Sequence, residues 1–218
     1  MKAIPILFST PMVQAILDGR KTQTRRVVKP QPLTHGRTDS RVRIYQRGEK
    51  WEVADTFSND GFSCLDSFKC PYGQPGDVLW VRESFNRIEY RGSIEYVYKA
   101  EPSIDPCKNK FSSYDPSIHM PKAACRLFLQ VKSVRVERLQ DISEDDAIAE
   151  GIGTTNGIPV GMTSHYIDYL DEKNCYSSSI NSFKSLWQSI KGPESWDANP
   201  WVWVVEFERI EKPAGWPF

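Results

Sequence analysis

The chain has 218 residues, and its 28 lysines and arginines balance 28 aspartates and glutamates, so the formal net charge is zero. This balance gives no sign of a long nucleic-acid footprint, and any such binding must come from a local patch. The length is most simply one domain, and no apolar stretch is long enough to cross a bilayer. A small ligand is favoured, and a membrane protein is not expected.

The cysteine pattern predicts a reduced protein without a structural metal. Five cysteines are an odd number without close pairing, and the N-terminus lacks the apolar stretch and cleavage site of a signal peptide. Cys64 and Cys70 resemble half of a zinc knuckle, but no second pair has the spacing that zinc needs. We therefore expect a cytoplasmic protein that holds no metal.

Predicted strands outnumber predicted helices. Strands are indicated by apolar runs or by alternation, and helices by apolar spacing between capping residues. In chain order, the sequence predicts a strand over 4–8, a helix over 11–18, a hairpin of 41–46 with 51–57, a strand over 78–82, a hairpin of 88–90 with 94–99, a strand over 127–139, a helix begun by Ser143 and closed by Gly151, a helix over 180–190 and a strand over 201–208. Residues 59–76 and 101–121 are predicted to be irregular. This pattern fits an α+β protein with a partly closed β-barrel and short helices at its rim.

The most informative run is residues 19–26, directly after the first helix. Thr10 is placed to cap that helix and Gly19 to end it, so the residues that follow leave a well-anchored element. Lys21 and Thr24 lie three residues apart, and a hydroxyl becomes a good nucleophile when a neighbouring base takes its proton. A lysine whose pKa is lowered by its surroundings can be that base. The alternative is a basic surface turn whose charges are simply solvated, and neither side chain is expected to fill the core.

Three segments together resemble the ASCH-domain family, which belongs to the PUA-like β-barrels that handle RNA and nucleosides. Residues 19–26 match its G-x-K-x-x-x-x-R signature, and residues 76–82 resemble its G-D-x-L-x-V strand. Residues 141–152 resemble the helix that carries the catalytic glutamate of small bacterial 4-acetylcytidine amidohydrolases, which places that glutamate on Glu150. The resemblance implies a single PUA-like barrel over 1–218, with insertions at about 34–72, 85–121 and 153–196. Insertions of this length are similar to those of bacteriophage and prophage members.

Glu150 has a physical argument of its own. It lies in the last turn of its predicted helix, where the helix dipole disfavours a carboxylate. A position that is unfavourable for a structural glutamate suits a general acid or base. The alternative is an exposed glutamate on a polar turn.

The remaining candidates would bind the substrate or a nucleic acid. The family signature includes Gly19, and arginines offer a rigid fork of donors for a phosphate or a base edge. Trp80 could stack on a base or lie in the core, and Trp203 is expected in the core. His119 lies on a loop between prolines, where packing does not explain a histidine, so it is a candidate to line the site. Each arginine has the alternative of a surface ion pair. The binding candidates are Gly19, Arg25, Arg26, Trp80, Arg82 and His119.

These observations predict a hydrolase that cleaves an amide on an acylated cytidine nucleoside or related base. Thr24 would attack the acyl carbonyl, Lys21 would accept its proton, and Glu150 would protonate the departing amine. No cofactor is required, and the expected partner is a modified nucleoside or RNA. The alternative is a non-catalytic module that binds RNA or a nucleotide. A ribonuclease is less favoured, because His119 would be its only acid-base histidine.

Overall fold

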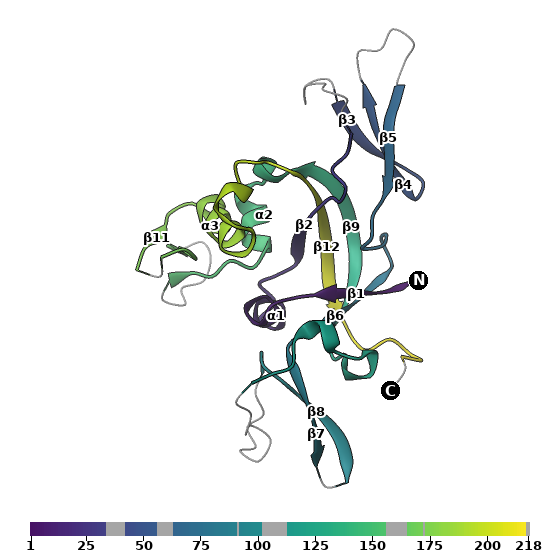
Figure 1. The fold of residues 1–218 in the computed structure, drawn as a ribbon, viewed down its shortest axis with the longest axis vertical. Coiled ribbons are helices and arrows are strands. Elements are labelled where there is room, and N and C mark those ends of the chain that lie inside the picture. Colours follow the sequence, from purple (N-terminus) through teal and green to yellow (C-terminus); the bar gives the residue numbers. More distant parts are fainter. Residues whose placement is uncertain are drawn as a thin grey trace.

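A computed structural model describes residues 1–33, 42–55, 63–90, 92–101, 113–155, 165–171 and 173–216. Within these residues, one curved sheet of five strands forms the centre of the molecule, in the order β1-β6-β9-β12-β2 (Figure 1). β1 runs parallel to β6, and the other neighbours are antiparallel. The strands are β1 (Ala3–Leu7), β2 (Gln23–Val27), β6 (Val78–Arg82), β9 (Phe128–Arg138) and β12 (Trp201–Ile210).

The two faces of β12 bury different clusters. Trp203, Val205 and Phe207 pack with residues of β1, β6 and α1 on one side, whereas Val202 and Val204 face the helices α2 and α3 on the other. Trp203 is 1% exposed, which confirms its predicted place in the core. The alternation that predicted this strand is therefore the alternation of two buried faces.

The two edge strands of the sheet approach each other without pairing. Among the described residues, β1 and β2 form no backbone ladder, but the Arg26 guanidinium on β2 donates to the Leu7 carbonyl on β1 at 2.7 Å. The structure therefore confirms a sheet-rich α+β protein. Closure into a barrel is not found in the described part of the chain, and the PUA-like barrel stays a prediction.

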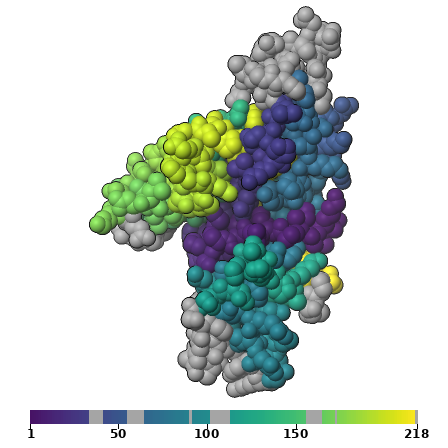
Figure 2. Space-filling model, in the orientation of Figure 1, coloured from purple at the N-terminus to yellow at the C-terminus, as the bar shows by residue number. Residues whose placement is uncertain are grey.

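Elements from the three predicted insertions project from the sheet (Figures 1 and 2). The first holds three antiparallel strands, the second a hairpin, and the third the helix α3 with two short strands. Irregular structure was predicted over 59–76, and β5 shows that this was wrong within the described residues. Residues 34–41, 56–62, 102–112 and 156–164 of these segments lie outside the described ranges. The strands are β3 (Val42–Arg47), β4 (Lys50–Asp55), β5 (Ser63–Lys69), β7 (Phe85–Tyr90), β8 (Ser93–Tyr98), β10 (Tyr166–Ile167) and β11 (Cys175–Tyr176).

Three α-helices lie among the described residues: α1 (Thr10–Leu17), α2 (Glu144–Ala149) and α3 (Ser179–Lys191). Ser9, rather than Thr10, is the N-cap of α1, and its side chain makes no capping bond. Ser143 caps α2 as predicted, because its hydroxyl accepts from the Asp146 N–H at 3.1 Å. Single 3₁₀ turns lie at Ser117–His119, Lys122–Ala124, Leu139–Asp141 and Pro193–Ser195. No helix in the described ranges is both long and apolar enough to span a membrane.

Candidate active site

Lys21 is held by the end of α1. Gly19 ends this helix with a φ of +73°, and the N–H groups of Arg20 and Lys21 both donate to the Ala15 carbonyl at 2.9 Å. Lys21 therefore lies on a fixed turn just before β2 begins. Gly19 itself is exposed and does not line either cavity described below, so its contribution is the turn.

Lys21 and Glu150 form a buried ion pair although 129 residues separate them. The Lys21 Nζ lies 2.8 Å from the Glu150 Oε2 and 2.8 Å from the Glu150 carbonyl oxygen. The Thr22 N–H donates to the Ala149 carbonyl at 2.9 Å, so the backbones are joined as well. The Lys21 side chain is 0% exposed and that of Glu150 is 5% exposed. The expectation that neither Lys21 nor Thr24 lies in the core is wrong, because both residues are only 2% exposed.

A glycine permits this close approach. Gly151 closes α2 with a φ of +83°, a conformation that side chains rarely adopt. A Cβ at this position would lie 2.7 Å from the Cβ of Lys21 and 3.0 Å from that of Ala15. The predicted helix end is therefore also the point where α2 packs against the Lys21 turn.

Two opposing effects set the protonation of Lys21. Burial lowers the pKa of the Lys21 ammonium below the usual lysine value, and the Glu150 carboxylate offsets part of this effect. The positive charges of Arg26 and Arg25 lower it further. The net lowered pKa brings Lys21 closer to the neutral form that accepts a proton.

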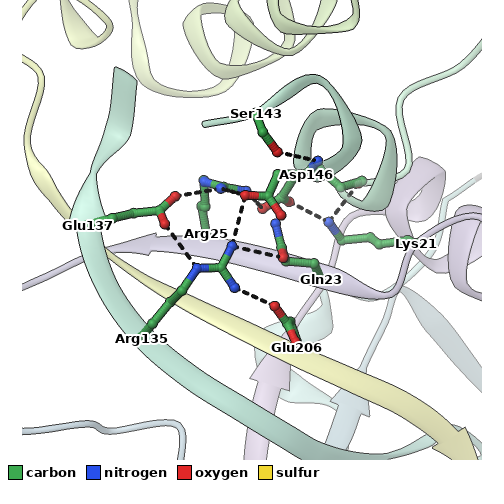
Figure 3. Close-up of polar contacts among 9 residues, drawn as sticks. Lys21, Gln23, Arg25, Arg135, Glu137, Ser143, Asp146 and Glu206 are labelled. Carbon is green, nitrogen blue, oxygen red and sulfur yellow. Dashed lines mark hydrogen bonds and ion pairs between the residues drawn. The ribbon is translucent and has the colours of Figure 1, made fainter. Parts of the chain in front are cut away.

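Arg25 connects this pair to a wider ion-pair network (Figure 3). Its Nη1 lies 3.3 Å from the Glu150 Oε1, and its Nη2 donates to Glu137 at 2.6 Å and to Asp146 at 2.9 Å. Arg135 donates to the same Asp146 oxygen at 2.8 Å and to Glu137 at 3.0 Å. Sequence reasoning assigned no chemistry to the network residues Arg135, Glu137, Asp146 and Glu206.

The strand register explains why these residues meet. Arg25 on β2 and Arg135 on β9 both pair with Val204 of β12, so their side chains share one face of the sheet. Burial alone would raise the pKa of Asp146, but Arg135 and Arg25 outweigh it and hold the pKa below the usual range. The polar positions of the predicted strand 127–139 indicated which residues leave its apolar face, but nothing in the sequence gave the register.

Thr24 and Glu150 line one small cavity at the free edge of β2. Its volume is about 60 Å³, which is room for a few water-sized groups. In the described part of the chain, no hydrogen bond joins the Thr24 hydroxyl to Lys21, and Lys21 does not line this cavity. Glu150 both contacts Lys21 and lines the cavity with Thr24. The lining residues are Met12, Thr24, Arg25, Arg26, Glu150, Phe183, Leu186, Trp187, Ile190 and Lys191.

A larger groove adjoins the small cavity. Its volume is about 470 Å³, and it shares Met12, Glu150, Leu186 and Ile190 with the cavity. This volume lies in the range of small-molecule sites, whereas the 60 Å³ cavity is far below that range. The α1 and α3 helices form opposite walls, so the insertion over 153–196 shapes both spaces.

Three N–H donors at the small cavity have no partner among the described residues. They are the Nε groups of Arg25 and Arg26 and the indole Nε1 of Trp187. A buried donor without a partner costs about 1–3 kcal/mol.

The other predicted binding residues lie outside the cavity. Arg82 on β6 donates to the Ile118 carbonyl, which places it beside the 3₁₀ turn that ends at His119. Trp80 is 8% exposed and packs edge-on against Trp216 at 6.1 Å, so packing accounts for its position. Of the predicted binding residues, Arg25 and Arg26 line the cavity. Gly19, Trp80, Arg82 and His119 do not. No group of three metal-ligating side chains lies within the described ranges.

In comparisons with protein-family models, curated proteins and solved structures, no match to this chain was found. The ASCH resemblance therefore rests on the three sequence motifs. What the geometry adds is that two of these motifs, residues 19–26 and residues 141–152, are in direct contact.

Proposed function

We propose that this protein is an amidohydrolase of ASCH type that removes an acyl group from the exocyclic amine of a modified cytidine nucleoside or a related base. The observation that carries the proposal is the buried contact of Lys21 with Glu150, beside a cavity that Thr24 and Glu150 share. A nucleophile, a proton acceptor and a proton donor are the groups that amide cleavage needs.

The proposed reaction proceeds by acyl transfer. The Thr24 hydroxyl oxygen bonds to the acyl carbon, and its proton passes to the Lys21–Glu150 pair. The carbon–nitrogen bond then breaks, and the exocyclic amine leaves with a proton from the same pair. Water hydrolyses the acyl-threonine, so amide and water become a carboxylic acid and a free amine. The lowered pKa of Lys21 favours its part as acceptor.

The two spaces divide the substrate between them in this proposal. A nucleoside fits the groove of about 470 Å³, and a short acyl group fits the cavity of about 60 Å³. Glu150 lies at the boundary, where the bond to be cleaved would lie. The sheet with its nearly meeting edges is compatible with the PUA-like barrel that the motifs suggest.

The test is hydrolysis of N4-acetylcytidine by the purified protein, followed by chromatographic separation of cytidine. We expect Thr24→Ala and Lys21→Ala each to abolish turnover, and the double variant to lose little more than either alone, because residues acting as a unit are non-additive. Thr24→Ser retains some turnover because it keeps the hydroxyl. Circular dichroism at the assay temperature shows which variants are folded. Wild-type turnover in a folded Thr24→Ala protein would refute the nucleophile.

The alternative is a module that binds an RNA or a nucleotide without cleaving it. The place of Arg26 in the cavity lining supports this alternative, because a guanidinium suits oxygen acceptors whether or not a reaction follows. A binder tolerates loss of the Thr24 hydroxyl, whereas the hydrolase does not. Binding of a nucleoside by wild type and Thr24→Ala alike, without turnover in either, would favour the module.

A further inference from the structure

We propose that Glu137 and Asp146 are positioning residues for Glu150, because they hold the Arg25 guanidinium and Arg25 holds one oxygen of the Glu150 carboxylate. This inference rests on the proposed function and adds to it two residues that act through Arg25. Neither of them lines the cavity or the groove, and the sequence motifs give neither a chemical role.

The Glu150 carboxylate is held by both of its oxygens. The Lys21 Nζ lies 2.8 Å from Oε2, and the Arg25 Nη1 lies 3.3 Å from Oε1. The last torsion of a glutamate side chain is broad, so a contact to one oxygen alone leaves the carboxylate plane free to turn. One contact comes from the turn after α1 and the other from β2, and together they fix that plane. The orientation of Glu150 therefore depends on where the Arg25 guanidinium lies.

Arg25 is bound more closely by Glu137 and Asp146 than by Glu150. Its Nη2 lies 2.6 Å from the Glu137 Oε1 and 2.9 Å from the Asp146 Oδ2, close to the usual lengths of charge-assisted hydrogen bonds. The contact of its Nη1 with Glu150 is longer, at 3.3 Å. Because the Arg25 side chain is 0% exposed, water does not replace these partners. The two outer carboxylates therefore set the position of the guanidinium.

A second arginine stiffens this arrangement. Arg135 donates to Asp146 at 2.8 Å and to Glu137 at 3.0 Å, so each outer carboxylate joins both arginines (Figure 3). Asp146 and Glu150 lie one turn apart on α2, whose helical backbone continues to Glu150 with a φ of −68° and a ψ of −8°. The guanidinium is a rigid planar fork, so a constraint on one nitrogen also fixes the others.

The proposed reaction depends on this position through its proton transfers. The Lys21–Glu150 pair takes a proton from the Thr24 hydroxyl and gives one to the departing amine, and such transfers need groups within hydrogen-bond reach. A misplacement of about 1 Å, caused by a change far from the chemistry, can cost about 100-fold in rate. Loss of the outer carboxylates should therefore lower kcat. KM should stay the same, because Glu137 and Asp146 line neither space.

The first experiment compares carboxylates by the arginine that they contact. Asp146→Asn and Glu137→Gln remove charges that hold Arg25. Glu206→Gln is the matched control, because within the described residues Glu206 pairs with Arg135 and not with Arg25. We expect kcat for N4-acetylcytidine to fall about 10-fold in each single variant and about 100-fold in the double variant. KM should stay within about twofold, and Glu206→Gln should match the wild type.

Circular dichroism identifies the folded variants. Wild-type kcat in a folded double variant, with Thr24→Ala inactive, overturns the positioning role and leaves the proposed function standing. If the double variant does not fold, wild-type kcat in both single variants overturns the role in the same way.

A second experiment needs no turnover. Crystal structures of the wild type and the variants show directly where the Arg25 guanidinium and the Glu150 carboxylate lie. We expect both groups to move by about 1 Å or more when Asp146→Asn and Glu137→Gln are combined, and to stay in place in Glu206→Gln. Such a shift in a protein that hydrolyses no acylated cytidine keeps the hold on Glu150 and refutes the proposed reaction. Unmoved Arg25 and Glu150 side chains in the double variant overturn the positioning role.

Discussion

The Lys21–Glu150 pair can be tested through the stability of the protein, independently of any substrate. Lys21→Met keeps most of the side-chain volume and removes the buried ammonium. Within the described ranges, the Glu150 carboxylate then keeps one ion pair, with the Arg25 Nη1 at 3.3 Å. The variant therefore leaves a buried carboxylate that is only partly compensated.

The magnitude follows from distance and burial. At 2.8 Å and an effective dielectric constant of about 20, the Coulomb attraction of the pair is about 6 kcal/mol. Desolvation of both groups opposes this, and breaking a buried pair typically costs about 3–5 kcal/mol. Because Arg25 still compensates Glu150, we expect Lys21→Met to lower the free energy of unfolding by about 3 kcal/mol.

An exposed pair of the same residue types provides the control. Lys132 and Glu208 lie 2.7 Å apart, and each side chain is 50% exposed. Solvent screens such pairs, so Lys132→Met should cost at most about 1 kcal/mol. Urea unfolding followed by circular dichroism measures both variants, with the m-value as a check that compactness is unchanged. Equal losses in the two variants would contradict the burial of the Lys21–Glu150 pair.

Three further predictions concern other parts of the molecule. Gly151→Ala and Gly19→Ala both force an alanine into a positive φ, but only at Gly151 would the new Cβ crowd a neighbour, 2.7 Å from the Lys21 Cβ. We therefore expect thermal unfolding to show a larger fall in the melting temperature for Gly151→Ala. Burial raises the pKa of Tyr98 from 10.0 to about 12, so the folded state retains a proton that the unfolded state loses. The free energy of unfolding should therefore fall as the pH rises from 10.0 to about 12, and Tyr98→Phe should lack this part of the fall. Net neutrality allows about three phosphate contacts, so any RNA binding should weaken with salt with a logarithmic slope of about −2, and a much steeper slope contradicts a local patch.

The sequence predicted the helices and strands whose own apolar residues recur at the period of the element. The helix predicted over 180–190 is α3 (Ser179–Lys191), and the strand predicted over 78–82 is β6. Both have apolar residues at the spacing of their secondary structure, because each buries a face of its own. End signals were less reliable, since Ser9 rather than Thr10 is the N-cap of α1.

Four strands of the described residues were missed: β2, β5 and the two-residue strands β10 and β11. For β2 and β5, the neighbouring strands rather than the local patterns make the segment a strand. β2 (Gln23–Val27) is polar and basic, yet it pairs with β12 along its length. β5 (Ser63–Lys69) has weak alternation, but Phe68 packs edge-on against Trp203 at 5.4 Å. Tertiary contact of this kind overrides local propensity.

The same limit applies to the candidate site. Lys21, Thr24 and Glu150 could be proposed from motifs, because local sequence identifies them. Arg135 and Glu137 could not, since they join Arg25 only through the pairing of β9 and β2 with the same strand. Trp187, which lines the cavity, also escaped, because its helical spacing indicates a core position.

The network around Arg25 is better explained by positioning than by stability. Its three cations, Lys21, Arg25 and Arg135, face four carboxylates, those of Glu137, Asp146, Glu150 and Glu206, so the group carries one excess negative charge. Buried ion pairs often stabilise a fold less than apolar side chains of the same volume. What the network does provide is a fixed position, because carboxylates engage both terminal nitrogens of Arg25. Lys21 and Arg25 together hold the Glu150 carboxylate in the cavity lining, where the proposed reaction needs its proton transfer.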